Sequence, residues 1–228
     1  MSSKVTDTQS GTQQTQTSPR GLLYVVSSPS GGGKGTLIRR VLDVVPNLSY
    51  SVSFTTRSPR SGEVNGREYF FVTPGQFEEM VAADEFLESA TVHCKLYGTA
   101  RKQVAKEIAE GHDIILEVDV QGAASVRKLM SDSVSIFILP PSFEVLKSRL
   151  TARGTDSPEE LDVRLRNAPV ELRDYSAFQY VIINDDAELA ANQLAAIVFA
   201  ERARLSRQER KVRNVVEAFM AKEEGNSN

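Results

Sequence analysis

One short segment constrains the fold of this chain more than any other. The apolar run LLYVV (residues 22–26) leads directly into the glycine-rich stretch SSPSGGGKGT (residues 27–36). A buried strand followed by such a loop and a helix presents backbone N–H groups that converge on an anion, and glycines let the chain curl closely around phosphates. This order predicts a phosphate-binding loop of the pattern G-x-x-x-x-G-K-[ST] at the start of an α/β domain.

The loop departs from that pattern at two positions. Gly33 and Lys34 are in register, but Ser28 replaces the first glycine, and Gly35 replaces the serine or threonine that normally follows the lysine. A glycine-rich turn between a strand and a helix, with no ligand, is the alternative interpretation. The rest of the chain has to decide between the two.

Short apolar runs and longer amphipathic segments alternate along the chain, which predicts a parallel sheet flanked by helices. Strands are expected at residues 22–26, 49–57, 68–72, 114–120, 135–141 and 180–184. Helices are expected at 33–45, 74–87, 99–111 and 156–168, and from Asp185 to beyond Phe219. In the helix at 156–168, Ser157 and Glu160 form a capping box, with Pro158 at the first helical position.

Composition narrows the class of protein. A chain of 228 residues with 40% hydrophobic residues fits one α/β domain, or a core with small appended subdomains. The net charge of −3 gives no general attraction to nucleic acid, and no apolar stretch approaches the ~20 residues that span a bilayer. The single cysteine, Cys94, excludes an internal disulfide. Residues 1–20 are expected to be a disordered tail without a targeting signal, which points to the cytoplasm.

A second polar group follows the strand at 49–57. Arg57 and Arg60 are separated by a proline turn, so both can face one anionic group, and arginine binds phosphate through a bidentate fork. Tyr69 adds a hydroxyl donor nine residues further on. The competing interpretation is a solvated, charged hairpin.

Several spaced motifs together resemble guanylate kinase, a family of P-loop nucleoside monophosphate kinases. They are the loop at 28–36, the pattern SxSxTTRxPRxGExxGxxY at 51–69, FLE at 86–88, LYGT at 96–99, VDVQG at 118–122 and ND at 184–185. They occur in the family's order over residues 21–205. The resemblance implies a P-loop NTPase core with a five-stranded parallel sheet flanked by helices, formed by residues 21–52, 111–142 and 168–206. It also implies a small mixed α/β GMP-binding subdomain (53–110), a helical lid (143–167) and a C-terminal helical extension and tail (207–228).

The resemblance implies transfer of the γ-phosphoryl group of ATP to GMP, and to dGMP, with Mg²⁺ as the cofactor. The implied catalytic residues are Lys34, Arg57, Arg149, Arg153 and Arg164. The implied ATP-binding residues are Ser28, Pro29, Ser30, Gly31, Gly32, Gly33, Lys34, Gly35, Thr36, Arg149, Arg153 and Asn184. The implied GMP-binding residues are Ser53, Arg57, Arg60, Tyr69, Glu88, Tyr97, Thr99 and Asp119.

Two features of the implied site follow from chemistry. The N1 and N2 donors of guanine suit one carboxylate, for which Glu88 is placed, whereas adenine offers an acceptor that a carboxylate repels. Gly35 lacks the hydroxyl that usually binds Mg²⁺, and the strand at 114–120 is expected to place Glu117 and Asp119 on one face. The hypothesis is that ATP and water hold most of the metal, with Glu117 compensating beyond the direct ligands.

Other functions remain open at this point. A guanylate-kinase-like domain that binds proteins without catalysis is one, although the P-loop lysine and the lid arginines are all present; a P-loop kinase acting on a sugar phosphate is another. The sequence does not decide between a monomer and a homo-oligomer. A basic cluster at residues 202–213 is interleaved with Glu201 and Glu209, which favours a solvated helix or a subunit contact over nucleic acid.

Overall fold

The structure, a computed structural model, describes residues 20–92, 94–152, 154 and 157–225. The tail expected at residues 1–20 lies outside the described residues except for Arg20, and so does Arg153. The central element is a five-stranded sheet whose neighbouring strands all run parallel, as expected. Its order is β2 (Leu48–Tyr50), β7 (Asp113–Glu117), β1 (Leu23–Ser27), β8 (Val134–Leu139) and β9 (Tyr180–Ile183).

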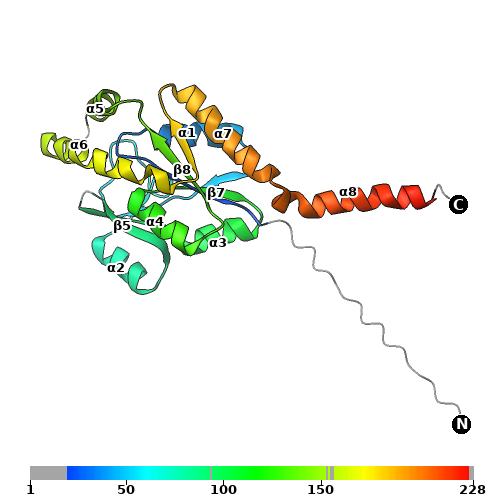
Figure 1. The fold of residues 1–228 in the computed structure, drawn as a ribbon. Coiled ribbons are helices and arrows are strands. Elements are labelled where there is room, and N and C mark those ends of the chain that lie inside the picture. The colour runs from blue at the N-terminus through cyan, green and yellow to red at the C-terminus, as the bar shows by residue number, and fades with distance from the viewer. Residues whose placement is uncertain (1–19, 93, 153, 155–156, 226–228) are drawn as a thin grey trace, which may run out of the picture.

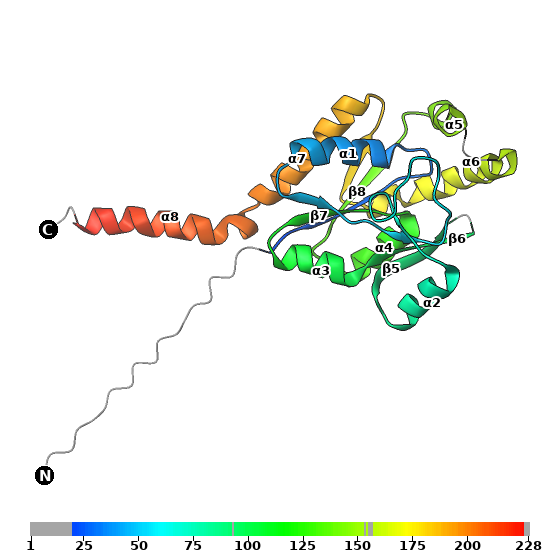
Figure 2. The same ribbon diagram turned by 180° about the vertical axis from the view of Figure 1, so that it is seen from behind.

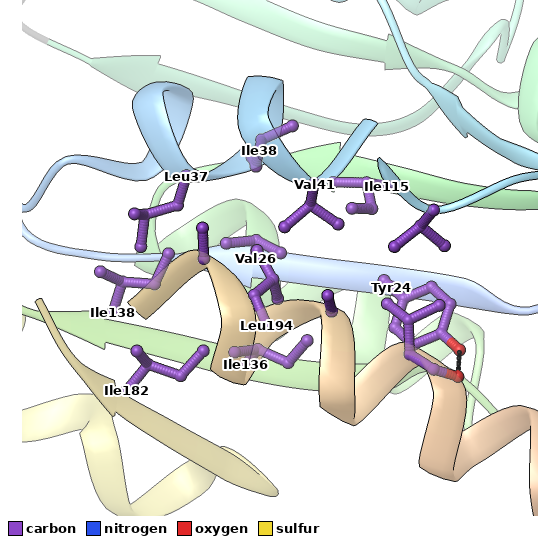
Figure 3. Close-up of a cluster of buried hydrophobic side chains, with 14 of the residues drawn as sticks. Tyr24, Val26, Leu37, Ile38, Val41, Ile115, Ile136, Ile138, Ile182 and Leu194 are labelled. Carbon is purple, nitrogen blue, oxygen red and sulfur yellow. Dashed lines mark hydrogen bonds between the residues drawn. The ribbon is translucent and has the colours of Figure 1, made fainter. Parts of the chain in front are cut away.

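Helices cover both faces of this sheet, as Figure 1 shows. Alternate residues of β1 point to opposite faces because side chains along a strand have a period of two. Tyr24 and Val26 pack against α1 (Lys34–Val44) and α7 (Ala187–Ala203), in the cluster drawn in Figure 3. Leu23 and Val25 belong to the cluster that contains α3 (Arg101–Ala109) and α4 (Val120–Leu129). The central strand is therefore buried on both sides and places the loop that follows it at one edge of the sheet.

A second, smaller sheet lies beside the core. Its strand order is β4 (Phe70–Phe71), β3 (Phe54–Thr55), β6 (Lys95–Ala100) and β5 (Phe86–Val92). The single strand expected at 49–57 is wrong, because β2 pairs in the core sheet and β3 pairs with β6 in the small sheet. The chain changes sheets between them, which an unbroken alternating pattern does not reveal.

Three expected boundaries in this region are also wrong. Helix α2 (Pro74–Ala82) ends before Asp84, whose left-handed φ of 53° stops it, and Phe86 starts β5. Phe86 pairs with Ala100 of β6, and its ring stacks on Phe77 of α2 with a centroid separation of 4.5 Å. Thr99 belongs to β6, so α3 starts at Arg101. The expected strand 114–120 ends at Glu117, and α4 starts at Val120.

Two helices form the segment expected to be a lid. They are α5 (Phe143–Ala152) and α6 (Pro158–Leu172), which pack together through Leu146, Leu150 and Ala168. The predicted capping box is confirmed: the Ser157 side chain accepts from the Glu160 N–H, and the Glu160 side chain accepts from the Ser157 N–H. A short 3₁₀ helix, η1 (Arg173–Ala177), leads from α6 towards β9.

The C-terminal segment is two helices rather than the one expected. Asp186 caps α7, which ends at Ala203, and Arg204 has extended dihedrals (φ −55°, ψ 138°) before α8 (Leu205–Gly225) begins. Figures 1 and 2 show α8 projecting away from the body of the molecule. Within the described part of the chain, no helix is both long and apolar enough to cross a membrane.

Candidate active site

The glycine-rich loop joins β1 to α1 at the carboxyl edge of the core sheet. Gly31 and Gly33 have left-handed φ values of 88° and 94°, and a Cβ atom at Gly33 would lie only 2.3 Å from Nδ2 of Asn184. Glycine is therefore required there. The Lys34 ammonium lies over the loop, where it donates to Oγ of Ser28 at 3.0 Å. The loop thus holds a fixed cation above the start of α1, as an anion site requires.

Asn184, directly after β9, connects this loop to α5, in the segment expected to be a lid. Its side-chain Nδ2 donates to the backbone carbonyl of Gly32 at 2.9 Å. Its backbone carbonyl accepts from Nη2 of Arg149 at 2.9 Å. The structure therefore brings together Asn184, the loop and one lid arginine, three elements far apart in sequence.

The second lid helix also contacts the loop, through Ser30. Nη1 of Arg164 donates to the Ser30 hydroxyl at 3.3 Å, and the Ser30 N–H donates to Oε2 of Glu171 at 3.0 Å. Sequence reasoning missed Glu171. The available signal was its position seven residues after Arg164, which places both on one face of a helix.

A cavity of about 190 Å³ opens beside this loop. The predicted site residues that line it are Ser28, Ser30, Lys34, Ser53, Arg57, Arg60, Tyr69, Glu88, Tyr97, Glu117, Asp119 and Arg164. The core, the small sheet and the lid all contribute to this wall. Predicted residues outside the wall are Pro29, Gly31, Gly32, Gly33, Gly35, Thr36, Thr99, Arg149 and Asn184.

Cationic and aromatic side chains on strands of the small sheet, or in the loop between β3 and β4, contribute to the cavity wall. Nη2 of Arg57 contacts both carboxylate oxygens of Glu63 at 2.9 Å, and its guanidinium lies 5.3 Å from the centre of the Tyr69 ring. The Tyr69 and Tyr97 rings meet edge to face at 5.9 Å. Burial raises the pKa of Tyr69, so its hydroxyl keeps its proton as a donor. Glu63, which sequence reasoning did not assign, also accepts from the Arg60 N–H at 2.7 Å and fixes this turn.

A buried carboxylate forms a different part of the wall. Glu88 is 7% exposed, and its Oε1 accepts from the hydroxyl of the fully buried Thr99 at 2.6 Å. Burial raises the pKa of Glu88 to about 7; the Thr99 hydrogen bond opposes this rise, and the negative charge of Asp119 adds to it. Because a hydroxyl has one proton, the Thr99 proton is used in the bond to Glu88 in this conformation, whereas Ser53 is a hydroxyl residue on the cavity wall.

The expectation that Glu117 and Asp119 lie on one face of a strand is wrong. They do not share a strand face, because β7 ends at Glu117 and Asp119 caps α4 by accepting from the Gly122 N–H at 2.9 Å. Both nevertheless line the cavity. The Tyr50 hydroxyl, which sequence reasoning missed, donates to Oε2 of Glu117 at 3.4 Å.

The position of Glu117 relative to Gly35 tests whether a divalent cation suits this site. A Cβ atom at Gly35 would lie 3.3 Å from Oε2 of Glu117, so the carboxylate lies directly against the residue that lacks the usual hydroxyl. A carboxylate oxygen beside the phosphate-binding loop is the kind of donor that Mg²⁺ takes. The residues present therefore fit this metal.

A parallel sheet with a lysine-bearing glycine loop, the helix pair α5–α6 whose arginines contact that loop or the residue packed on it, and an adjoining cavity lined by further arginines define a P-loop phosphotransferase. The comparisons refine that class. The guanylate kinase family model matches residues 20–201, most of the chain. The chain belongs to the guanylate kinase family.

Individual relatives are similar to this chain over most of their own length. The chain is 51% identical over 180 residues to a guanylate kinase of Dechloromonas aromatica, covering 79% of this chain and 89% of that one. It is 48% identical over 189 residues to a guanylate kinase of Koribacter versatilis, covering 82% and 81%. A crystal structure of guanylate kinase from Anaplasma phagocytophilum superposes with a TM-score of 0.71 at 34% identity, covering 83% of this chain and 90% of that one.

Proposed function

We propose that this protein transfers the γ-phosphoryl group of ATP to GMP, giving ADP and GDP, and that it also accepts dGMP. The observation that supports this most directly is Glu88, a buried carboxylate that accepts from Thr99 and lies on the wall of the cavity that Lys34 and Arg57 also line. A carboxylate matches the adjacent N1–H and N2–H donors of guanine, and a mismatched base would leave buried polar groups unpaired. One cavity thus offers a guanine acceptor and phosphate-binding cations.

The chemistry requires positioning and charge neutralisation rather than covalent help from the protein. An oxygen of the GMP phosphate attacks the γ-phosphorus of ATP, the bond from that phosphorus to the β-γ bridging oxygen breaks, and ADP leaves with the electron pair. Because the attacking phosphate is already ionised at neutral pH, no general base is needed.

Each part of the site has a role in this scheme. Arg57, Arg60, Tyr69 and Tyr97 hold the GMP phosphate. Lys34 and the loop amides hold the ATP phosphates, and Arg149 and Arg164 bring positive charge from the lid, where it stabilises the transferring group. Arg153, in the same lid, is proposed for the same role from the resemblance.

Mg²⁺ bound to ATP would supply charge neutralisation at the phosphate oxygens. The chain offers Glu117 near this position, oriented by the Tyr50 hydroxyl. We propose that Glu117 would support this ion from beyond its direct ligands, because its carboxylate lies against Gly35, which lacks the usual hydroxyl. Asp119 remains near the base, where it also caps α4.

The two alternative functions are less well supported. A protein-binding domain without catalysis has no need of Lys34 and Arg149 beside the loop, and both are there. The guanylate kinase family model covers residues 20–201, which include Glu88 and Thr99, and this favours guanine over a sugar phosphate as the group bound there.

A coupled assay of ADP formation tests the proposal. With ATP and Mg²⁺, GMP should exceed AMP, CMP and UMP in kcat/KM by roughly a hundredfold or more, the discrimination expected of a buried polar match. The control is Lys34→Met, which should abolish turnover while circular dichroism stays unchanged. Equal turnover of the four nucleotides, or none, would contradict the proposal.

A further inference from the structure

Helix α8 (Leu205–Gly225) presents large apolar side chains to solvent. Six of them are between 43% and 72% exposed: Leu205, Val212, Val215, Val216, Phe219 and Met220. In Figures 1 and 2 the helix leaves the body beyond α7 and continues outward in both views. Scattered single apolar residues on a surface are ordinary, but six on one helix are a patch that requires explanation.

These six residues lie on one side of the helix. At about 100° per residue they fall within an arc of about 140°, which also includes the positions of Gln208, Glu209 and Glu223, and the opposite side carries no large apolar residue. Asn214 and Ala218, for example, are exposed on that opposite side. The pattern is that of a helix that buries one stripe against a partner, as in a helix pair.

The helix is separate from the phosphotransferase machinery. The family model ends at residue 201, and no residue of the cavity wall lies on α8. Its start is anchored to the body: Nε2 of Gln208 donates to the Arg202 carbonyl at 2.7 Å, and Arg207 donates to the Arg20 carbonyl. The body therefore sets the direction of α8 but does not cover its stripe.

Charge along α8 indicates what covers the stripe. Residues 205–214 carry a net charge of +3, from Arg207, Arg210, Lys211 and Arg213 against Glu209. Residues 215–225 carry a net charge of −2, from Glu217, Glu223 and Glu224 against Lys222. A second α8 running antiparallel places each basic half against an acidic half, whereas a parallel copy places like charges together.

The same arrangement suits the shape of the molecule. Antiparallel pairing about a two-fold axis near Val215 and Val216 sets Val212 of one copy beside Phe219 of the other. It also leaves the two catalytic bodies at opposite ends of the helix pair. A two-fold contact of this kind closes on itself and gives a dimer rather than a filament.

We propose that α8 is a dimerisation helix that pairs antiparallel with α8 of a second copy of this chain. Isolated helices are marginal in water, and pairing buries the apolar stripe that would otherwise face solvent. The interface is built by residues outside the region shared with the family.

Sedimentation equilibrium of the full chain is the first test. The mass should rise from one chain towards two as the concentration increases from about 1 to 100 µM, because dimerisation follows mass action. The variant Val215→Glu/Phe219→Glu should remain a monomer throughout this range. Its matched control, Asn214→Glu/Ala218→Glu, has the same spacing on the opposite side and should dimerise like the unmodified chain.

Disulfide trapping tests the orientation in a Cys94→Ser background. Val216→Cys should link two chains, whereas Leu205→Cys should not, because antiparallel pairing separates the two copies of residue 205 by about 30 Å and a disulfide needs Cα atoms within about 7 Å. All these variants should keep kcat/KM for ATP and GMP, so the result is independent of the proposed function.

Three outcomes would overturn the proposal. They are a monomeric unmodified chain at every concentration, equal effects of the stripe and control variants, and preferential trapping of Leu205→Cys. Binding of a monomeric chain to vesicles of anionic lipid, lost in the stripe variant, would instead assign the stripe to a membrane surface.

Discussion

The pKa of Glu88 predicts a specific pH dependence for GMP use. In the proposed site, guanine's donors pair with the ionised carboxylate of Glu88, and burial raises the pKa of Glu88 to about 7. Below that value the ionised fraction falls about tenfold per pH unit, so kcat/KM for GMP should fall by the same factor. The GMP phosphate also titrates, with a second pKa of about 6, and this contribution must be removed.

Comparison with the variant Glu88→Gln removes the contribution of the substrate phosphate. The amide of this variant places a donor against guanine's donors, so we expect kcat/KM for GMP to drop at least roughly a hundredfold at pH 8. Its remaining pH profile reports the substrate phosphate alone. The ratio of unmodified enzyme to variant, measured in steady-state assays between pH 5.5 and 8.5, should therefore follow one ionisation near pH 7.

Two neighbours should move that ionisation in opposite directions. Thr99→Val removes a hydrogen bond to the charged carboxylate, worth about 1.5–3 kcal/mol, and should raise the pKa of Glu88 by about one to two pH units. Asp119→Asn removes a negative charge and should lower it. A flat ratio across the pH range, or equal shifts for both variants, would refute the reasoning.

The raised pKa of Glu88 also predicts how the free energy of unfolding depends on pH. The folded pKa exceeds the unfolded one, so the folded state holds the proton more tightly, and stability present below pH 4.5 is lost as pH rises through about 7. The loss is on the order of 3 kcal/mol of unfolding free energy. Urea unfolding at pH 5 and pH 8 should show a smaller difference for Glu88→Gln than for the unmodified protein.

The remaining predictions concern other contacts. Glu117→Ala should raise the Mg²⁺ concentration for half-maximal activity about tenfold, the usual effect of losing a residue that supports a metal from beyond its direct ligands. Gly35→Ser should change that concentration much less. A Mg²⁺ titration in which Glu117→Ala matches the unmodified enzyme would contradict this. Glu171→Gln should lower KM for ATP because it removes a negative charge from the loop but keeps an acceptor for the Ser30 N–H; a raised KM would count against it. Arg202→Ala should lower the unfolding free energy by about 1–3 kcal/mol without changing kcat/KM, because the buried Asp113 carboxylate loses the guanidinium that lies 2.7 Å away. Urea denaturation measures this change. An unchanged midpoint would show that the ion pair does not stabilise the fold.

The elements that the sequence predicts well depend on local patterns. Each of these elements lies within a few consecutive residues: the apolar runs of the core strands, the glycine loop before α1 and the capping box of α6. Local propensity and periodicity determine these elements, because each is stabilised mainly by neighbours a few residues away or by burial of a continuous run. The spaced motifs in turn predicted most of the cavity wall, including Arg57 and Glu88.

Only the tertiary structure decided where one pattern ends and another begins. The segment 49–57 divides because β2 pairs with β7, whose partner residues are 65 positions away, and β3 pairs with β6, whose partner residues are 42 and 44 positions away. Phe86 belongs to a strand because it pairs with Ala100 of β6. A helix and a strand compete closely in such short segments, and long-range packing settles the competition.

The contacts that join separate parts of the site are of the same kind. Glu117 meets Gly35, and Glu171 meets Ser30, although 82 and 141 residues separate the members of these pairs. The sequence alone determined which side chains have the chemistry to bind phosphate and guanine. Which of them share a cavity was decided by the fold, because a distance through space depends on how the sheets and helices pack rather than on spacing along the chain.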